Sequence, residues 1–153
     1  MSRLSDIIEA VETALQGIKQ SAGYHTDAGY HVHLRREFQL SPPDKPALIL
    51  WPGDVTDSLD GDPAPSQGEE NHLLPIEIEG YIDTDERGEA AENLRQDILK
   101  ALKADQYFGG LTEGYSGNTS STVEVEEAGE EGLLGHVQVK ATIFFVTGYG
   151  EED

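Results

Sequence analysis

The segment LPIEIEGYID, residues 74–83, decides the fold class of this chain. In it, Ile76 and Ile78 alternate with Glu77 and Glu79. A two-residue alternation of apolar and acidic side chains is typical of a β-strand with one buried and one solvated face. We therefore predict a half-buried strand here, with its acidic face turned away from the core.

Two segments on either side of this strand have helical periodicity. Apolar residues recur at i, i+3 and i+4 spacing from Leu4 to Ile18, and again through residues 87–105. This spacing predicts two amphipathic helices. Ser2 or Ser5 is expected to cap the first helix, which should end by Gly23, and Thr84 or Asp85 is expected to cap the second.

The remaining patterned segments predict strands. Residues 30–38 alternate between two faces after the turn signals, and residues 47–51 are a short apolar run next to prolines. Residues 120–128 and 133–150 alternate like the two strands of a hairpin joined by the acidic turn GEEG. The order is helix, two strands, long loop, strand, helix, two strands. We predict a single α+β domain over residues 1–153, with a mostly antiparallel sheet of about five strands and two helices on one face.

The predicted long loop is the segment DVTDSLDGDPAPSQGEEN, residues 54–71. It contains six acidic residues, two prolines and two glycines, but no basic residue. Such a composition buries too little apolar surface to order itself, so we expect an exposed loop. Its acidic residues are Asp54, Asp57, Asp60, Asp62, Glu69 and Glu70.

Charge and composition exclude several functional classes. Thirty acidic and ten basic residues give a formal net charge of −20, which argues against a conventional nucleic-acid-binding face. Cysteine is absent, so disulfides, thiolate metal sites and cysteine nucleophiles are excluded. No stretch approaches the roughly 20 apolar residues that span a bilayer, so we expect a soluble protein without a membrane partner.

The segment HTDAGYHVH, residues 25–33, is the clearest candidate for metal chemistry. His25, Asp27, His31 and His33 are residue types that bind zinc or iron. The simpler interpretation, which we favour, is a Gly/Asp turn leading into a strand with outward-facing histidines. A cation site stays open as an alternative.

No motif of an enzyme accompanies these histidines. The chain has no nucleophile elbow, phosphate-binding loop or dinucleotide fingerprint, and its adjacent glutamate pairs are typical of solvated surface. We therefore predict neither an enzymatic activity nor a cofactor.

The order of the segments supports a more specific hypothesis. The chain runs through LSDIIEAVETALQGI, GYHTDAGYHV, PALILWPGD, an acidic loop, LPIEIEGYID, AAENLRQDILKAL, DQYFGGL and VQVKATIFFVTGYG. This arrangement, which covers nearly the whole chain, resembles the tail terminator proteins of long-tailed bacteriophages. Other small neck and tail-completion proteins have a similar build and stay an alternative.

The resemblance implies a structural virion protein of the tail or neck, assembled in the host cytoplasm. Its subunits would form a ring, typically six-fold, at the head-proximal end of the tail tube. That ring would end tube polymerisation and join the tail to the head connector, while the DNA genome passes through without specific binding. The implied partners are other copies of the chain, the tail tube protein and the connector or neck protein.

Three groups of residues are candidates for these roles. We expect the last strand, residues 137–146, to be an edge that pairs with a neighbouring subunit, through Val137, Val139, Ala141, Ile143 and Phe145. We expect the acidic residues of the 54–71 loop to dock on the tube or connector. An acidic lumen would repel DNA, and its candidate residues are Glu77, Glu79, Glu124 and Glu126.

Two further hypotheses belong to other functional classes. A metal-binding module or metal-dependent enzyme would bind zinc or manganese through His31 and His33. A DNA-mimicking inhibitor would use the acidic surface to occupy the nucleic-acid site of another protein.

Overall fold

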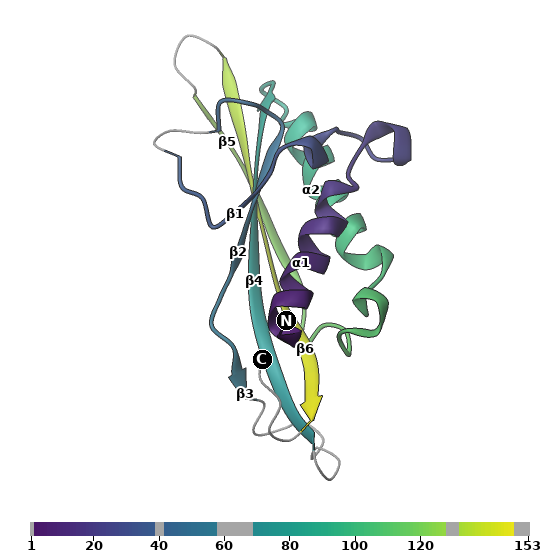
Figure 1. Ribbon diagram of the computed structural model, residues 1–153. Coiled ribbons are helices and arrows are strands. Elements are labelled where there is room, and N and C mark those ends of the chain that lie inside the picture. Colours follow the sequence, from purple (N-terminus) through teal and green to yellow (C-terminus); the bar gives the residue numbers. More distant parts are fainter. Residues whose placement is uncertain (1, 39–41, 58–68, 128–131, 149–153) are drawn as a thin grey trace.

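The centre of the fold is one twisted sheet that runs the length of the molecule (Figure 1). The computed structural model describes residues 2–38, 42–57, 69–127 and 132–148. These residues form six strands in the order β1-β2-β4-β6-β5, and β3 pairs with β4 outside that path. The strands are β1 (Val32–Leu34), β2 (Ala47–Pro52), β3 (Thr56–Asp57), β4 (Glu69–Thr84), β5 (Ser120–Glu127) and β6 (Leu133–Gly148).

All strand pairs are antiparallel except β1 with β2, which is parallel. β4 and β6 pair over their whole length, from Glu69 opposite Gly148 to Thr84 opposite Leu133. The α+β class and the mostly antiparallel sheet predicted from the sequence are therefore confirmed. The sixth strand, β3, is a two-residue segment within the predicted long loop.

Two helices cover one face of the sheet and leave the other face without helices (Figure 1). They are α1 (Arg3–Gln16) and α2 (Glu89–Ala104), and three short 3-10 turns lie at η1 (Gln20–Ala22), η2 (Ala28–Tyr30) and η3 (Phe108–Gly110). Ser2 caps α1 as predicted, because its hydroxyl accepts a hydrogen bond from the Ser5 amide.

The predicted cap of α2 is wrong in detail. Gly88 is the N-cap and has a left-handed φ of 68°, and no side chain caps the helix. Asp85 lies one turn earlier, where its carboxylate accepts a hydrogen bond from the Arg87 amide. This turn is what lets the chain leave β4 and start the helix, and glycine is the residue that adopts its geometry without strain.

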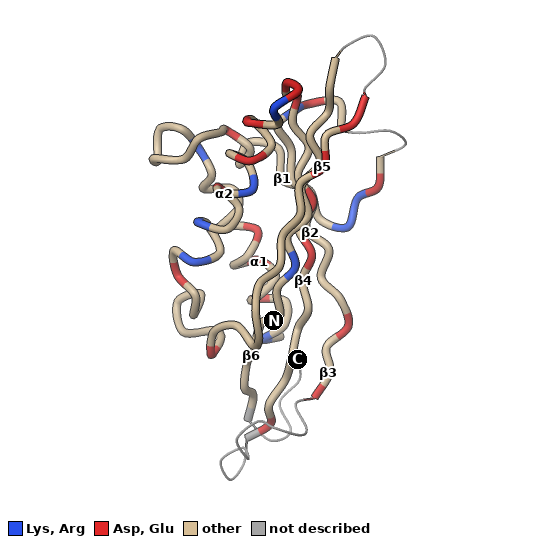
Figure 2. Tube along the Cα trace, turned by 180° about the vertical axis from the view of Figure 1, so that it is seen from behind, with Lys and Arg blue, Asp and Glu red and all other residues tan. Residues whose placement is uncertain are grey.

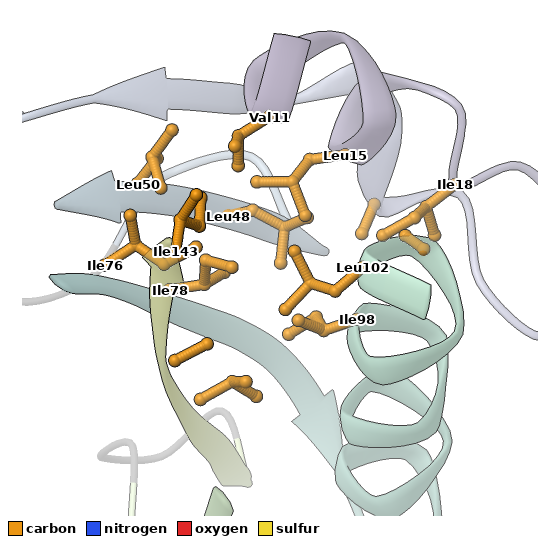
Figure 3. Packing of buried hydrophobic residues seen from close by; sticks show 14 of the residues in the cluster. Val11, Leu15, Ile18, Leu48, Leu50, Ile76, Ile78, Ile98, Leu102 and Ile143 are labelled. Atoms are coloured by element: carbon orange, nitrogen blue, oxygen red, sulfur yellow. The ribbon is translucent and has the colours of Figure 1, made fainter. Parts of the chain in front are cut away.

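The core lies between the helices and the covered face of the sheet. Figure 3 shows strand residues Leu48, Leu50, Ile76, Ile78 and Ile143 meeting helix and loop residues Val11, Leu15, Ile18, Ile98 and Leu102. All of these side chains are at most 3% exposed. Alternate residues of each strand thus supply the core, as the period of the sequence predicts.

Two glycines let α2 lie close to the sheet. A Cβ atom on Gly80 would stand 2.7 Å from Leu94 Cδ2, and one on Gly135 would stand 2.6 Å from Ala91 Cβ. Both distances are shorter than ordinary van der Waals contact, so a side chain at either position would push the helix outward.

The first strand is shorter than predicted. Strand pairing covers only Val32–Leu34 of the expected residues 30–38. Arg35 has a left-handed φ of 49°, which ends the extended backbone and turns the chain away from the sheet.

Candidate assembly surfaces

The last strand is not an edge of the sheet. β6 lies between β4 and β5, and its later residues are also bridged by the segment 113–116, where the Ser116 amide donates to the Thr142 carbonyl at 2.9 Å. The expectation that residues 137–146 form a free edge is therefore wrong. The side chains proposed for subunit contact, Val137, Val139, Ala141, Ile143 and Phe145, are all buried in the core of the chain itself.

β1 and β5 are the outer strands of the path formed by the described residues. β1 pairs only with β2, and β5 pairs only with β6. Each carries a large apolar side chain that is exposed to solvent: Leu34 is 37% exposed and Val125 is 39% exposed. The free sides of these two strands are the places where the sheet can be extended.

The four proposed lumen acids lie on the same face of the sheet, opposite the helices. The register puts Glu77 opposite Lys140 on β6, and it puts Glu124 opposite His136 on the same strand. Residues paired across an antiparallel sheet share a face, and residues two apart in one strand do too. Glu79 and Glu126 therefore join this helix-free surface, which we call the open face.

Glu79 is the centre of a hydrogen-bonded cluster on the open face. Its carboxylate accepts a hydrogen bond from Trp51 Nε1 at 2.6 Å and from the Tyr81 hydroxyl at 3.2 Å. His136 Nε2 lies 2.9 Å from the same carboxylate, and the His136 ring stacks on Tyr81 at 4.8 Å between centroids. Glu79 is therefore a partly buried, fixed acid and not a freely solvated one.

The cluster also changes the ionisation of Tyr81. Burial raises the pKa of Tyr81 to about 12, and the nearby negative charge of Glu79 together with its hydrogen bond adds to this increase. The sequence shows the alternation of Glu79 and Tyr81 but gives no sign of Trp51 and His136, which come from other strands. Only the register of three strands brings the four side chains together.

The other lumen candidates differ in exposure. Glu77 forms a loose ion pair with Lys140, whose Nζ lies 3.8 Å from the carboxylate. Glu124 and Glu126 are exposed on β5. These two acids are the most solvent-accessible of the four.

The predicted acidic loop is partly ordered into the sheet. Asp57 belongs to β3 and lies opposite His72, and Glu69 and Glu70 belong to β4. The prediction of an irregular loop over residues 54–71 is therefore wrong at both ends, because those residues pair as strands. Asp60 and Asp62 lie outside the described residues.

His72 connects the three strands at this end of the sheet. The buried imidazole lies with Nδ1 3.1 Å from the Asp57 carboxylate and Nε2 2.7 Å from the Thr147 hydroxyl. Its ring also lies against Phe145, 4.9 Å between centroids. The proposed docking residue Asp57 is thus exposed, but it also contacts His72 and so ties β3 to β4. Asp54, which precedes it, is exposed too.

The histidine-rich segment forms the predicted turn into the first strand. Buried Asp97 of α2 accepts hydrogen bonds from the His25 amide at 2.9 Å and from the Thr26 amide at 2.8 Å. It also accepts one from the Thr26 hydroxyl at 2.7 Å. The Asp27 carboxylate instead accepts a hydrogen bond from the Gln20 amide at 2.9 Å.

The carboxylates of Asp97 and Asp27 are therefore occupied by hydrogen bonds that hold the backbone of this turn and of the preceding segment. Within residues 2–38, 42–57, 69–127 and 132–148, no group of three or more His, Asp and Glu side chains is arranged to hold a metal ion. His31 and His33 follow the turn, and burial together with the charge of Arg36 lowers the pKa of His33.

The two helices enclose a groove of about 560 Å³ on the outer side of the molecule. Its lining includes the small side chains of Ala10, Ala14 and Ala101 and the acids Asp6 and Glu9. None of the described helices has the length and apolar character needed to cross a membrane.

Comparison with known proteins finds similarity among solved structures. No family model matches the chain, and no curated protein matches it. Among solved structures, the chain is similar to the PVC sheath/tube terminator of an extracellular contractile injection system, determined by cryo-EM in the extended state. The identity is 12% and the TM-score 0.40, over 95% of this chain and 58% of that one. The chain thus spans little more than half the length of that terminator.

Proposed function

We propose that this chain is a tail-terminator subunit. Copies of it form a ring, with six subunits, at the head-proximal end of a tail tube. The ring ends polymerisation of the tube and offers a surface to the head connector. The role is structural and involves no enzymatic reaction.

One observation carries this proposal: the strand path of the described residues ends in two different outer strands, β1 at one end and β5 at the other. A contact between two different surfaces of identical subunits is heterologous, and it generates a closed ring when the rotation between neighbours closes. Unpaired strand edges are surfaces that favour such contacts. The order of segments that resembles tail terminators is the second support.

The open face suits the inner wall of such a ring. It carries no helix, and its exposed acids Glu124 and Glu126 share this face with Glu77 and Glu79, from which β6 separates them. A negative wall repels the phosphates of the genome, so DNA passes without specific binding. We propose Asp54, Asp57, Glu69 and Glu70, together with Asp60 and Asp62, as the surface that docks on the tube or connector in the virion neck.

The experiment that tests this proposal measures mass and tube length. Light scattering across protein concentration, salt and Mg²⁺ should detect a closed species of about six subunits. Salt should favour that species, because screening of acidic self-repulsion increases with ionic strength. The same protein, added to polymerising tail tube subunits from the same genome, should cap the tubes, and electron microscopy should show a ring at one end.

A protein that stays monomeric in all these conditions and leaves tube length and tube ends unchanged would exclude the terminator role. An unrelated protein of similar negative charge is the control, because it separates capping from a general electrostatic effect on polymerisation.

A further inference from the structure

We infer that neighbouring copies of this chain join through two unlike edges of the sheet. The basic edge consists of Leu34, Arg35 and Arg36, at the end of β1 and directly after it. The acidic edge consists of residues 124–127 at the end of β5. The inference rests on the proposed ring and names the two surfaces that meet in it.

The charges of the two edges are complementary. Arg35 and Arg36 are the only adjacent basic residues in a chain with a net charge of −20. Both are exposed, and neither forms an ion pair with another described residue. Figure 2 shows, along the Cα trace, the basic stretch after β1 and the acidic residues at the end of β5.

The acidic edge consists of Glu124, Glu126 and Glu127 around Val125. All four side chains are exposed, and within the described part of the chain none of the three glutamates has an ion-pair partner. Arg35 and Arg36 follow the last paired residue of β1, Leu34, so they would meet these glutamates beside the new strand pair, where complementary charges orient the contact.

The apolar side chains of the two edges also correspond. Leu34 pairs with buried Leu50, and Val125 lies opposite Gly135 and near Gly88 at the start of α2. Leu34 and Val125 therefore both lie on the helix-covered side of the sheet. When two such sheets continue into one another, these exposed side chains are on the same side and can cover each other.

The strand directions also favour this pairing. β1 runs parallel to β2, and each following pair along the path to β5 is antiparallel, so β5 runs opposite to β1. Rotation about a ring axis that lies along the strands keeps the strand direction of every copy. β5 of one copy would thus meet β1 of the next as an antiparallel pair, which is the more stable arrangement.

The backbone of β1 is available for this pairing. The His31 carbonyl accepts from the Leu48 amide and the Arg35 amide donates to the Leu50 carbonyl, so these residues are bonded toward β2. In a parallel pair the residues between them, Val32 and Leu34, direct their backbone groups to the other side. That side is where a second copy would bind.

Pairing of like edges is disfavoured by the same charges. Two acidic edges would bring Glu124, Glu126 and Glu127 against their own copies, and two basic edges would bring four arginines together. Like charges brought together at an interface disfavour the contact. The contact is therefore heterologous, which is the type that closes into rings.

Cross-linking tests the contact directly, because the chain has no cysteine of its own. In the variant Leu34→Cys/Val125→Cys, a short bis-maleimide should link the two edges and give a ladder of covalent oligomers on a denaturing gel. An equimolar mixture of the two single variants should give dimers only, and each single variant alone should give none. A control variant, Leu34→Cys/Thr13→Cys, places the second cysteine on exposed α1 and should stay monomeric on the gel.

Charge reversal gives a second measurement on the same contact. Arg35→Glu/Arg36→Glu should weaken self-association by at least about tenfold, since like-charge contacts cost several kcal/mol. Adding Glu124→Arg/Glu126→Arg to that variant should restore association. Lys100→Glu/Lys103→Glu on α2 changes the net charge equally and should have a much smaller effect, with circular dichroism confirming the fold of each variant.

The outcomes separate this inference from the proposed function. Rings and capped tubes without the expected cross-links, or with association insensitive to reversal at the edges, would overturn the inference and leave the terminator role standing. Cross-links within either single variant would show a like-edge contact and also overturn it. The expected cross-links together with unchanged tube ends would support the contact and exclude the terminator role. A chain that neither associates nor cross-links at any salt or Mg²⁺ concentration overturns the inference.

Discussion

The two faces of β4 differ sharply although they belong to the same strand. On the covered face, Leu74, Ile76 and Ile78 are at most 3% exposed and belong to the apolar core. On the open face, Glu77 and Glu79 make polar contacts with side chains from the adjacent strands. The same backbone thus stabilises the fold on one side and presents charge on the other.

This difference predicts how each face responds to substitution. Removal of buried apolar surface costs both transfer free energy and the free energy of a cavity. Exposed polar contacts exchange readily for contacts with water and contribute much less. Glu79 is the intermediate case, because its carboxylate is fixed by three partners and its side chain is only 17% exposed.

The largest effect is expected at the centre of the covered face. Ile78→Ala should lower the free energy of unfolding by about 2–5 kcal/mol, because the fully buried side chain leaves a cavity between the sheet and the helices. Ile78→Val is the matched control and should cost about 0.5–1.5 kcal/mol. Urea unfolding followed by circular dichroism measures both, and equal values for the two variants would contradict the cavity argument.

The next effect is expected at Asp97 of α2, which is the one buried acid among the residues that the structure describes. Asp97→Asn should cost about 1.5–3 kcal/mol, because an amide nitrogen replaces one oxygen that accepts hydrogen bonds from the 25–26 turn. Thermal unfolding measures the loss. Gln96→Ala, at an exposed neighbouring position, is the control, and a loss for Asp97→Asn no larger than for Gln96→Ala would show that the turn holds without the carboxylate.

The sequence predicts which face of a strand each side chain lies on better than it predicts which distant residues come into contact. Alternation assigns Ile78 to the core and Glu77 to the outside, because the side-chain period of a strand is a local property. Asp97 is missed for the opposite reason. It falls among polar residues of a helical pattern, and only the tertiary approach of the 25–26 turn shows that it is buried.

The order of strands is also beyond the reach of local patterns. The alternation in β6 is correctly read as a strand with a buried face, but an inner strand and an edge strand have the same period. The expectation that Val137 and Phe145 contact a neighbouring subunit is therefore wrong, because both side chains lie in the core of the chain itself. Leu34 and Val125 could be identified from the sequence as residues of outer strands only by asking which predicted strands lack a second strand partner.

A smaller effect on stability, together with a spectroscopic signal, is expected at Glu79. Glu79→Gln should cost about 1–1.5 kcal/mol, because the amide retains only part of the hydrogen bonding to Trp51, Tyr81 and His136. It should also lower the pKa of Tyr81 from about 12 toward the ordinary value of 10.0 without reaching it, because burial is the larger cause of the increase. Ultraviolet difference titration of tyrosinate measures this change, with Tyr81→Phe as the control that identifies the signal.

The same tyrosine sets a pH window for stability. Its pKa is raised in the folded state, so the neutral phenol is favoured by folding. The resulting stabilisation is fully present below pH 10 and is lost as the pH rises toward about 12. Tyr81→Phe should make this part of the stability profile less steep without levelling it, because burial also raises the pKa of Tyr24 and of Tyr115. An unchanged profile would assign the alkaline loss to those other groups.

The smallest effect is expected one residue away from the largest. Glu77→Gln breaks an ion pair whose nitrogen and oxygen are 3.8 Å apart and whose Lys140 side chain is 61% exposed. Exposed pairs of this kind contribute at most about 1 kcal/mol and are screened by salt, so the cost should stay below about 0.5 kcal/mol and vanish at high ionic strength. Urea unfolding at low and high salt measures it beside Ile78→Ala, the adjacent position on the opposite face. A loss at Glu77 that approaches that of Ile78→Ala would mean that the open face also carries the fold, and then its acids would not be free to serve an assembly.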